Sequence, residues 1–128
     1  MIFGAGCDLC QVGRMAQALE SERFLGRVLT GNERARLEKL CPERRAERLA
    51  GIFAAKEAVA KALGTGFDGF GFADIEILAD PGGRPCAMLH GGAARRMPEG
   101  GRVHLSISHD GGLALAFAII EVEGPAAP

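Results

Sequence analysis

The feature that most constrains the fold is a continuous helical pattern over residues 42–64, PERRAERLAGIFAAKEAVAKALG. Pro42 stands at the first helical position, where proline is tolerated, and Gly64 stands where a left-handed C-terminal cap is expected. Apolar side chains cover most of a helical wheel drawn for this segment, in an arc made of Leu49, Ile52, Phe53, Val59, Ala60 and Leu63 with alanines opposite. A helix that is apolar nearly all round is usually buried. We therefore expect this helix to form the centre of the fold.

Three charged residues lie on this helix, and they need an explanation because an unpaired buried charge is strongly disfavoured. Lys56 falls inside the apolar arc, Glu57 lies beside its edge, and Lys61 follows Glu57 by four residues. In a purely structural interpretation, Glu57 and Lys61 form an ion pair while Lys56 extends to solvent along its aliphatic stem. In a functional interpretation, Glu57 is a metal ligand and the lysines bind phosphate. The helix alone favours neither.

Shorter helices are predicted around the long one. Residues 11–29 have the periodicity of one or two amphipathic helices. Thr30 and Glu33 form a capping-box pattern at the start of a helix over residues 31–40, which the Cys41-Pro42 step ends. A further short helix is expected over residues 91–97.

Strands are predicted on both sides of the long helix in the sequence. A buried strand over residues 2–8 ends at Asp8, and a Pro- and Gly-rich turn joins a hairpin of residues 73–79 and 86–89. The alternating segment over residues 103–109 turns at Asp110-Gly111-Gly112 into a last strand. The expected class is α+β, with a small antiparallel sheet packed on one long buried helix plus shorter helices. We expect a single domain over residues 1–123 and a frayed tail at 124–128.

Charge and composition narrow the function classes. A chain of 128 residues can bury a core without disulfides or metal ions. Its formal net charge of −1 argues against a protein that coats nucleic acid. The N-terminus lacks the positive region of a signal peptide, and no apolar run is long enough to span a bilayer. We therefore expect a cytoplasmic protein with neither nucleic acid nor membrane as a partner.

Asp8 lies between two cysteines in the stretch GAGCDLCQVGR, so the chemistry there could belong to the acid or to the thiols. Cys7 and Cys10 would need two more ligands for a zinc site, and the other cysteines have no companion at ligand spacing. They could form a redox pair or pack as small buried hydrophobes. Asp8 could cap the following helix, or supply one of the one or two carboxylates that magnesium typically takes.

Ser108 and His109 end a strand at a glycine turn. Adjacent strand residues point to opposite faces, so this pair does not form a nucleophile and its base. A histidine and a serine that line an anion or nucleotide pocket fit better. The arginines in the first turns of the long helix, Arg44, Arg45 and Arg48, either form a solvated face or recognise phosphate.

Taken in order, these motifs closely resemble the holo-acyl-carrier-protein synthases, a family of the 4'-phosphopantetheinyl transferases. The resemblance runs through nearly the whole chain, over a G-x-D strand end with Arg14 beyond it, RRAERLAGIFAAKEAVAKALGTG, ADIEIL, GRP and LSISHDGGLALAFAII. It implies the 4'-phosphopantetheinyl transferase fold. It also implies transfer of phosphopantetheine from coenzyme A to a serine of an apo acyl carrier protein, with release of adenosine 3',5'-bisphosphate, as in fatty acid biosynthesis.

The resemblance also assigns roles to residues of this chain. Asp8 and Glu57 should hold Mg²⁺ together with the pyrophosphate, Lys61 should contact phosphate, and Glu57 is the first choice for the group that takes the serine proton. The implied coenzyme A contacts are Arg45, Arg48, Lys61, Ser108 and His109. The implied carrier-protein contacts are Arg14, Arg23 and Arg27. The family is typically a homotrimer with active sites at subunit interfaces.

Three departures from the family pattern bear on this expectation. Ile52 replaces the arginine that commonly precedes F-A-A-K-E, and Arg48, one turn earlier, could substitute for it. Glu20 lies in a region that is often basic, which would weaken or retune carrier docking. Cys7 and Cys10 replace aliphatic residues, which favours packing. The alternative function is a coenzyme A or nucleotide-binding module with weakened or lost transferase activity.

Overall fold

The long helix expected from the sequence lies at the centre of the computed structural model, which describes residues 1–124; the expected tail therefore lies, apart from Gly124, outside the described residues. Helix α4 spans Pro42–Ala62, with Cys41 as its N-cap and Pro42 in its first turn. Gly64 adopts the left-handed conformation at φ +85°, which confirms the predicted C-terminal cap. Most of the residues of α4 beyond its second turn are buried.

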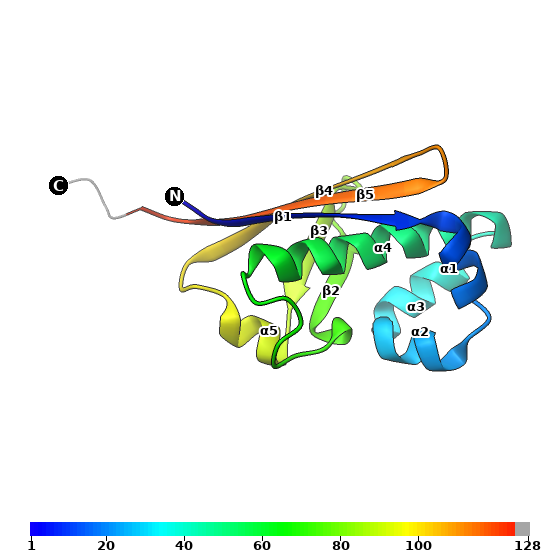
Figure 1. The fold of residues 1–128 in the computed structure, drawn as a ribbon, viewed down its shortest axis with the longest axis horizontal. Helices are drawn as coiled ribbons and strands as arrows, with labels where there is room; N and C mark the ends of the chain where they lie inside the picture. The colour runs from blue at the N-terminus through cyan, green and yellow to red at the C-terminus, as the bar shows by residue number, and fades with distance from the viewer. Residues whose placement is uncertain (125–128) are drawn as a thin grey trace.

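A three-stranded antiparallel sheet covers one side of α4 (Figure 1). Its strand order is β1-β5-β4, with β1 over Ile2–Gln11, β4 over Gly101–Asp110 and β5 over Leu113–Val122. The antiparallel α+β class is confirmed. The first strand is longer than the predicted 2–8 segment, because β5 continues to pair with it as far as Gln11 opposite Leu113. Asp8 consequently lies inside the strand rather than at its end.

The face of this sheet that meets α4 is built from very small residues. Strand β1 contributes Gly4 and Gly6, and β5 contributes the buried alanines Ala114, Ala116 and Ala118. A Cβ added to Gly6 would lie only 2.7 Å from Lys61 Cβ and 2.8 Å from Ala62 N. The lack of side chains at the two glycines therefore lets β1 lie directly against the α4 backbone.

The opposite face of the sheet is apolar and exposed. Side chains alternate along β1 and β5, so that Leu9, Leu113, Leu115 and Phe117 point away from α4, each at least 40% exposed. Cys7 lies on the same outer face, opposite Phe117 in the register. No described segment of the chain covers this face, and all the helices lie on the other side of the sheet (Figure 1).

The register also decides between the interpretations of the two cysteines. Cys7 and Cys10 are three residues apart in a strand, so their side chains point to opposite faces. Cys10 is buried at 2% exposure, as expected for a packing residue, whereas the expectation that Cys7 is buried is wrong. Both thiols are free. A redox or zinc pair at these positions is therefore excluded by geometry.

Three short helices gather at one end of α4 (Figure 1). The predicted helical region 11–29 forms two helices, α1 over Val12–Ala18 and α2 over Glu22–Val28. Helix α3 spans Gly31–Glu38, and the predicted capping box of Thr30 and Glu33 is present in both directions.

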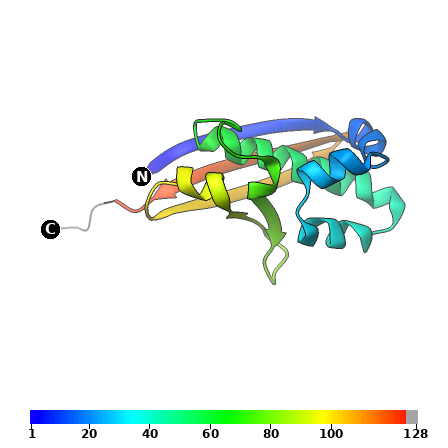
Figure 2. The same cartoon turned by 90° about the horizontal axis from the view of Figure 1, so that it is seen from below.

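A separate hairpin lies on the flank of α4 away from β1 (Figure 2). It consists of β2 over Ile75–Ala79 and β3 over Pro85–Leu89, and the short helix α5 over Gly91–Arg96 follows it. The predicted first strand began two residues too early, because Phe72–Asp74 form the 3-10 turn η1. Within residues 1–124, none of the helices combines the length and apolarity that a membrane crossing requires.

Candidate active site

Asp8, Glu57 and Lys61 come together where β1 crosses the second half of α4. Lys61 Nζ donates hydrogen bonds to Asp8 Oδ1 at 3.1 Å and to the Cys7 carbonyl oxygen at 3.0 Å. Burial, together with the nearby Asp8 carboxylate, raises the pKa of Glu57, and the Lys61 ammonium partly opposes this rise. We call this group of three side chains the acidic end.

The acidic end overturns two structural interpretations of the sequence. Gln11, not Asp8, is the N-cap of α1, and it makes no side-chain capping bond. Lys61 forms its ion pair with Asp8 on a neighbouring strand rather than with Glu57 on its own helix. Both changes arise because β1 lies directly over this turn of α4.

The donor set at the acidic end fits Mg²⁺. Two carboxylates lie close enough for one to raise the pKa of the other, and the single Lys61 ammonium offsets only part of their negative charge, so a divalent cation would relieve the rest. Magnesium commonly takes one or two protein carboxylates and completes its shell with water and phosphate oxygens. Residues 1–124 contain no cluster of three or more histidine, cysteine and acidic side chains that would provide a full protein shell, as structural zinc requires.

Lys56 follows neither of the interpretations drawn from the sequence. Its side chain is fully buried rather than extended to solvent, and it is not available to bind phosphate. Lys56 Nζ donates to Glu33 Oε1 at 2.8 Å, to the Val28 carbonyl at 2.8 Å and to the Phe72 carbonyl at 3.0 Å. Burial lowers the pKa of Lys56, and the Glu33 carboxylate opposes that effect. The expectation that a charge in the apolar arc needs a partner is confirmed.

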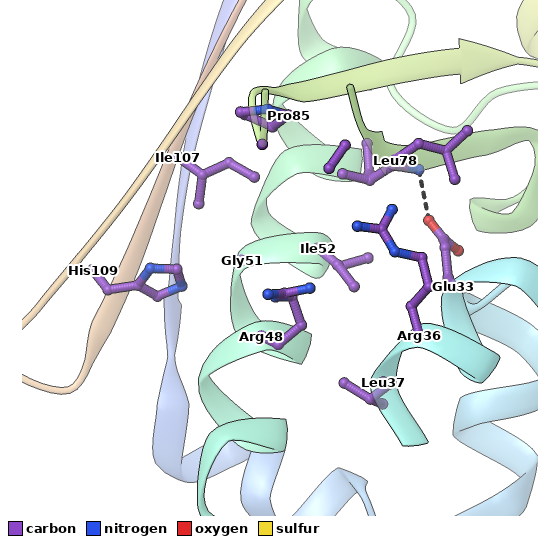
Figure 3. Close-up of a pocket in the computed structure, with 13 residues that line it drawn as sticks. Glu33, Arg36, Leu37, Arg48, Gly51, Ile52, Leu78, Pro85, Ile107 and His109 are labelled. Carbon is purple, nitrogen blue, oxygen red and sulfur yellow. Dashed lines mark hydrogen bonds between the residues drawn. The ribbon is translucent and has the colours of Figure 1, made fainter. Parts of the chain in front are cut away.

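A cavity of about 370 Å³ opens on the other flank of α4 (Figure 3). Its walls come from α3, from the first half of α4, from β2 and from β4, and Gly83 and Pro85 of the β2–β3 hairpin also line it. Two half-buried arginines, Arg36 and Arg48, line it, and neither forms an ion pair with any described residue. The remaining lining is largely apolar, with Ile52 and Ile107 among its members.

His109 completes the β4 wall of the cavity. It shares this face of β4 with Ile107, while Ser108 points to the exposed outer face, as the alternation predicted. The ring Nε2 of His109 lies 3.0 Å from the Glu47 carbonyl oxygen. A Cβ on Gly51 would approach that nitrogen to 3.0 Å, so the glycine makes room for the ring.

The cavity contains only part of the coenzyme A set expected from the sequence. Arg48 and His109 line it. The Arg45 guanidinium instead donates hydrogen bonds to the carbonyl oxygens of Leu40 and Glu38 at 3.0 and 3.1 Å. These bonds stabilise the turn between α3 and α4. Arg36 was missed, although its spacing from Glu33 and Leu37 places all three on one face of α3.

The acidic end and the cavity lie on opposite flanks of α4. At 3.6 residues per turn, the side chains of Ile52 and Glu57 point about 140° apart around the helix axis. Gly6 of β1 lies against Lys61, whereas Gly51 lies against Ile107 and His109 of β4. Within one chain the two groups therefore do not face each other.

The arginines expected to bind a carrier protein are exposed. Arg14 lies on α1, and Arg23 and Arg27 lie one turn apart on α2. Arg14 is also close enough to Cys10, two residues beyond Asp8, to lower the pKa of that thiol against the larger effect of burial. Glu20 is exposed in the turn that joins the two helices. Arg14 therefore lies near the acidic end, because the Asp8 and Glu57 carboxylates act on the same thiol.

Comparison with known proteins identifies the family. The model of the 4'-phosphopantetheinyl transferase superfamily matches residues 4–118. The holo-[acyl-carrier-protein] synthase of Geobacillus kaustophilus is 48% identical over 130 aligned positions, which cover all of this chain and 95% of that protein. The synthase of Methylobacterium radiotolerans is 46% identical, with 94% of each chain covered.

Solved structures agree with the sequence comparisons. The holo-(acyl-carrier-protein) synthase of Bacillus anthracis, in complex with CoA (3',5'-ADP), superposes with a TM-score of 0.83 at 38% identity, over 96% of this chain and 99% of that one. The Plasmodium yoelii acyl carrier protein synthase with ADP bound gives 0.84 at 32% identity, over 97% and 98%. The predicted resemblance and fold are confirmed. The chain belongs to the 4'-phosphopantetheinyl transferase superfamily, among its holo-[acyl-carrier-protein] synthases.

Proposed function

We propose that this chain transfers the 4'-phosphopantetheine group of coenzyme A to a serine of an apo acyl carrier protein and releases adenosine 3',5'-bisphosphate. The names of its relatives support this activity, as does the CoA (3',5'-ADP) held by the Bacillus anthracis structure. The observation that carries the proposal is the acidic end. Asp8, near the start of the chain, lies beside Glu57 and Lys61 of α4, and two carboxylates with a lysine are a combination that suits metal-assisted phosphoryl transfer.

The residues of the acidic end divide the chemistry between them. Mg²⁺ held by Asp8 and Glu57 would supply positive charge to the phosphate oxygens. The serine hydroxyl attacks the phosphorus that carries pantetheine, and the bond from that phosphorus to the bridging oxygen of the leaving nucleotide breaks. Lys61, whose side chain is 52% exposed, can turn from Asp8 to stabilise charge on the departing phosphate. Glu57 is the group that takes the serine proton in this proposal.

The nucleotide end of coenzyme A occupies the cavity in this proposal. Arg36 and Arg48 present two guanidinium groups without acidic partners among the described residues, and planar guanidinium groups suit phosphate oxygens. These two arginines supply positive charge to the cavity, in which Ile52 stands where the family commonly has an arginine. The coenzyme A contacts expected of Arg45 and Ser108 stay predictions. A cavity with two arginines weakens the argument that Ile52 reduces the chain to a binding module.

Two copies of the chain are needed to bring both groups to one substrate. The acidic end and the cavity lie on opposite flanks of α4. An active site therefore forms where the acidic end of one copy meets the cavity of the next copy. The exposed apolar sheet face, with Leu9, Leu115 and Phe117, is the kind of surface that assembly covers. We propose the homotrimer that the resemblance implies. We also propose that residues 1–123 act as one domain and that the enzyme works in the cytoplasm.

The carrier protein docks on the exposed arginines in this proposal. Arg14 lies near the acidic end, and Arg23 and Arg27 add exposed positive charge on the next helix, α2. An acidic partner would be steered to these arginines by charge.

A transfer assay tests the proposal directly. The protein is incubated with coenzyme A, Mg²⁺ and an apo acyl carrier protein, and the carrier is weighed by mass spectrometry. We expect the mass gain of one phosphopantetheine group, and its loss in Asp8→Asn and in Glu57→Gln. Glu99→Gln, at an exposed acid outside the described site, is the matched control and should keep full activity. Coenzyme A binding without modification of any carrier would favour the binding-module alternative instead.

A further inference from the structure

We infer that Glu33 is a positioning residue that holds three walls of the cavity in register and leaves both cavity arginines free for the nucleotide phosphates. The inference rests on the proposed function of the cavity. Glu33 lines the cavity, and its side chain is fully buried. Nothing in the reaction itself requires this carboxylate.

Each oxygen of Glu33 is attached to a different part of the cavity wall. Oε2 accepts a hydrogen bond from the Ile77 backbone N–H of β2 at 2.7 Å, drawn in Figure 3. Oε1 accepts from Lys56 Nζ of α4 at 2.8 Å and from the Thr30 backbone N–H at 2.8 Å. One carboxylate on α3 therefore binds both β2 and α4.

These attachments lie one helical turn from the residues that would contact the nucleotide. On α3, Arg36 follows Glu33 by three residues and therefore lies on the same face. On α4, Lys56 follows Ile52 by four residues and lies directly beyond it. A shift of Glu33 would thus move the α3 and α4 walls relative to each other and separate Arg36 from Arg48.

The pairing with Lys56 also sets the charge of the cavity. Among the described residues that line the cavity, Glu33 is the only acid, and an unpaired carboxylate there would be a natural partner for Arg36. Lys56 neutralises it in the interior instead, with further bonds to the Val28 and Phe72 carbonyls. No described buried polar side-chain atom lacks a partner. The positive charge of both arginines is therefore left for a ligand.

The experiment separates positioning from general stability. The first variant is Glu33→Gln, and the second is the double variant Glu33→Leu with Lys56→Met, which leaves no unpaired buried charge and so is expected to fold. The control is Ile120→Ala, a buried residue of β5 that does not line the cavity. For each protein we measure Tm, the Kd for adenosine 3',5'-bisphosphate by calorimetry, and KM for coenzyme A beside kcat.

We expect both Glu33 variants to weaken nucleotide binding and raise KM by about tenfold, because small misplacements of binding groups are costly, while kcat changes by less than about threefold. Ile120→Ala should lower Tm while Kd and KM stay near wild type. A folded double variant with wild-type Kd would overturn the inference, as would a control whose Kd weakens in step with its Tm. Absence of both nucleotide binding and transfer in the wild type would instead contradict the proposed function.

Discussion

Gly6 offers the sharpest test of how the acidic end is built. Its hydrogen faces the α4 backbone, two residues before Asp8 on the same face of β1. A methyl group at this position would lie 2.7 Å from Lys61 Cβ, and closer still to the Ala58 carbonyl oxygen. Carbon atoms pack best at about 3.5–4.0 Å, so Gly6→Ala must push the strand and the helix apart by roughly 1 Å.

The displacement has two measurable costs. Overpacking of this kind typically destabilises a protein by about 1–3 kcal/mol, which urea unfolding followed by circular dichroism would report. Asp8 moves with the strand while Glu57 and Lys61 stay on the helix. Because a misplacement of about 1 Å in an active site can cost about a hundredfold in rate, we expect kcat to fall by about that factor.

Two glycines provide controls. Gly4→Ala meets the Ala62 backbone in the same way but lies farther from Asp8, so it should cost similar stability and much less activity. Gly13→Ala, inside helix α1, meets no atom within 4 Å, so it should leave kcat unchanged and raise stability by at most about 1 kcal/mol. Wild-type kcat in Gly6→Ala would refute the reasoning, and so would an equal loss of kcat in Gly4→Ala, because the effect would then not be local to Asp8.

Three further outcomes follow from the structure. Hydrogen bonds from Thr30, His90 and Asn32 lower the pKa of Glu76 below its ordinary value of 4.5. The ionised Glu76 carboxylate therefore adds to the free energy of unfolding above pH 4.5, and this contribution is lost as the pH falls through the lowered pKa. Glu76→Gln should therefore cost about 2 kcal/mol at pH 7, and its difference from wild type in acid unfolding curves should shrink below pH 4.5; a constant difference would contradict this. Phe117→Asp should convert a trimer to monomers in light scattering after gel filtration, and persistence of the trimer would exclude the apolar sheet face as the interface. Arg27→Glu should raise KM for the carrier by about tenfold at low salt with kcat unchanged, whereas Arg95→Glu on α5 should not; equal effects would place the docking surface elsewhere.

Much of the fold follows from patterns that act over a few residues. The apolar wheel of α4, Pro42 and Gly64 at its ends, and the Thr30–Glu33 capping box were all predicted and found. The same is true of both hairpins. These features depend on backbone hydrogen bonds and side chains within one or two turns, so a sequence window contains nearly all of the relevant interactions.

The boundaries and burial states that were missed depend on neighbours outside such a window. Strand β1 continues to Gln11 because β5, about a hundred residues later in the chain, supplies hydrogen bonds to it. Cys7 is exposed because the sheet packs on α4 through its other face. The spacing of Arg36 puts it on the same face of α3 as Glu33 and Leu37, but only the packing of α3 beside α4 makes that face a wall of the cavity.

The sequence by itself determined the identity of the family, the central helix, and Asp8, Glu57 and Lys61 as the residues to examine. Only the tertiary structure decided how these charges are partnered. Lys61 of α4 forms an ion pair with Asp8 on β1, and Lys56 of α4 forms one with Glu33 on α3. The physical reason is that a charge inside a protein is stabilised by whichever opposite charge the packing brings within hydrogen-bonding distance, and that depends on how the whole chain folds.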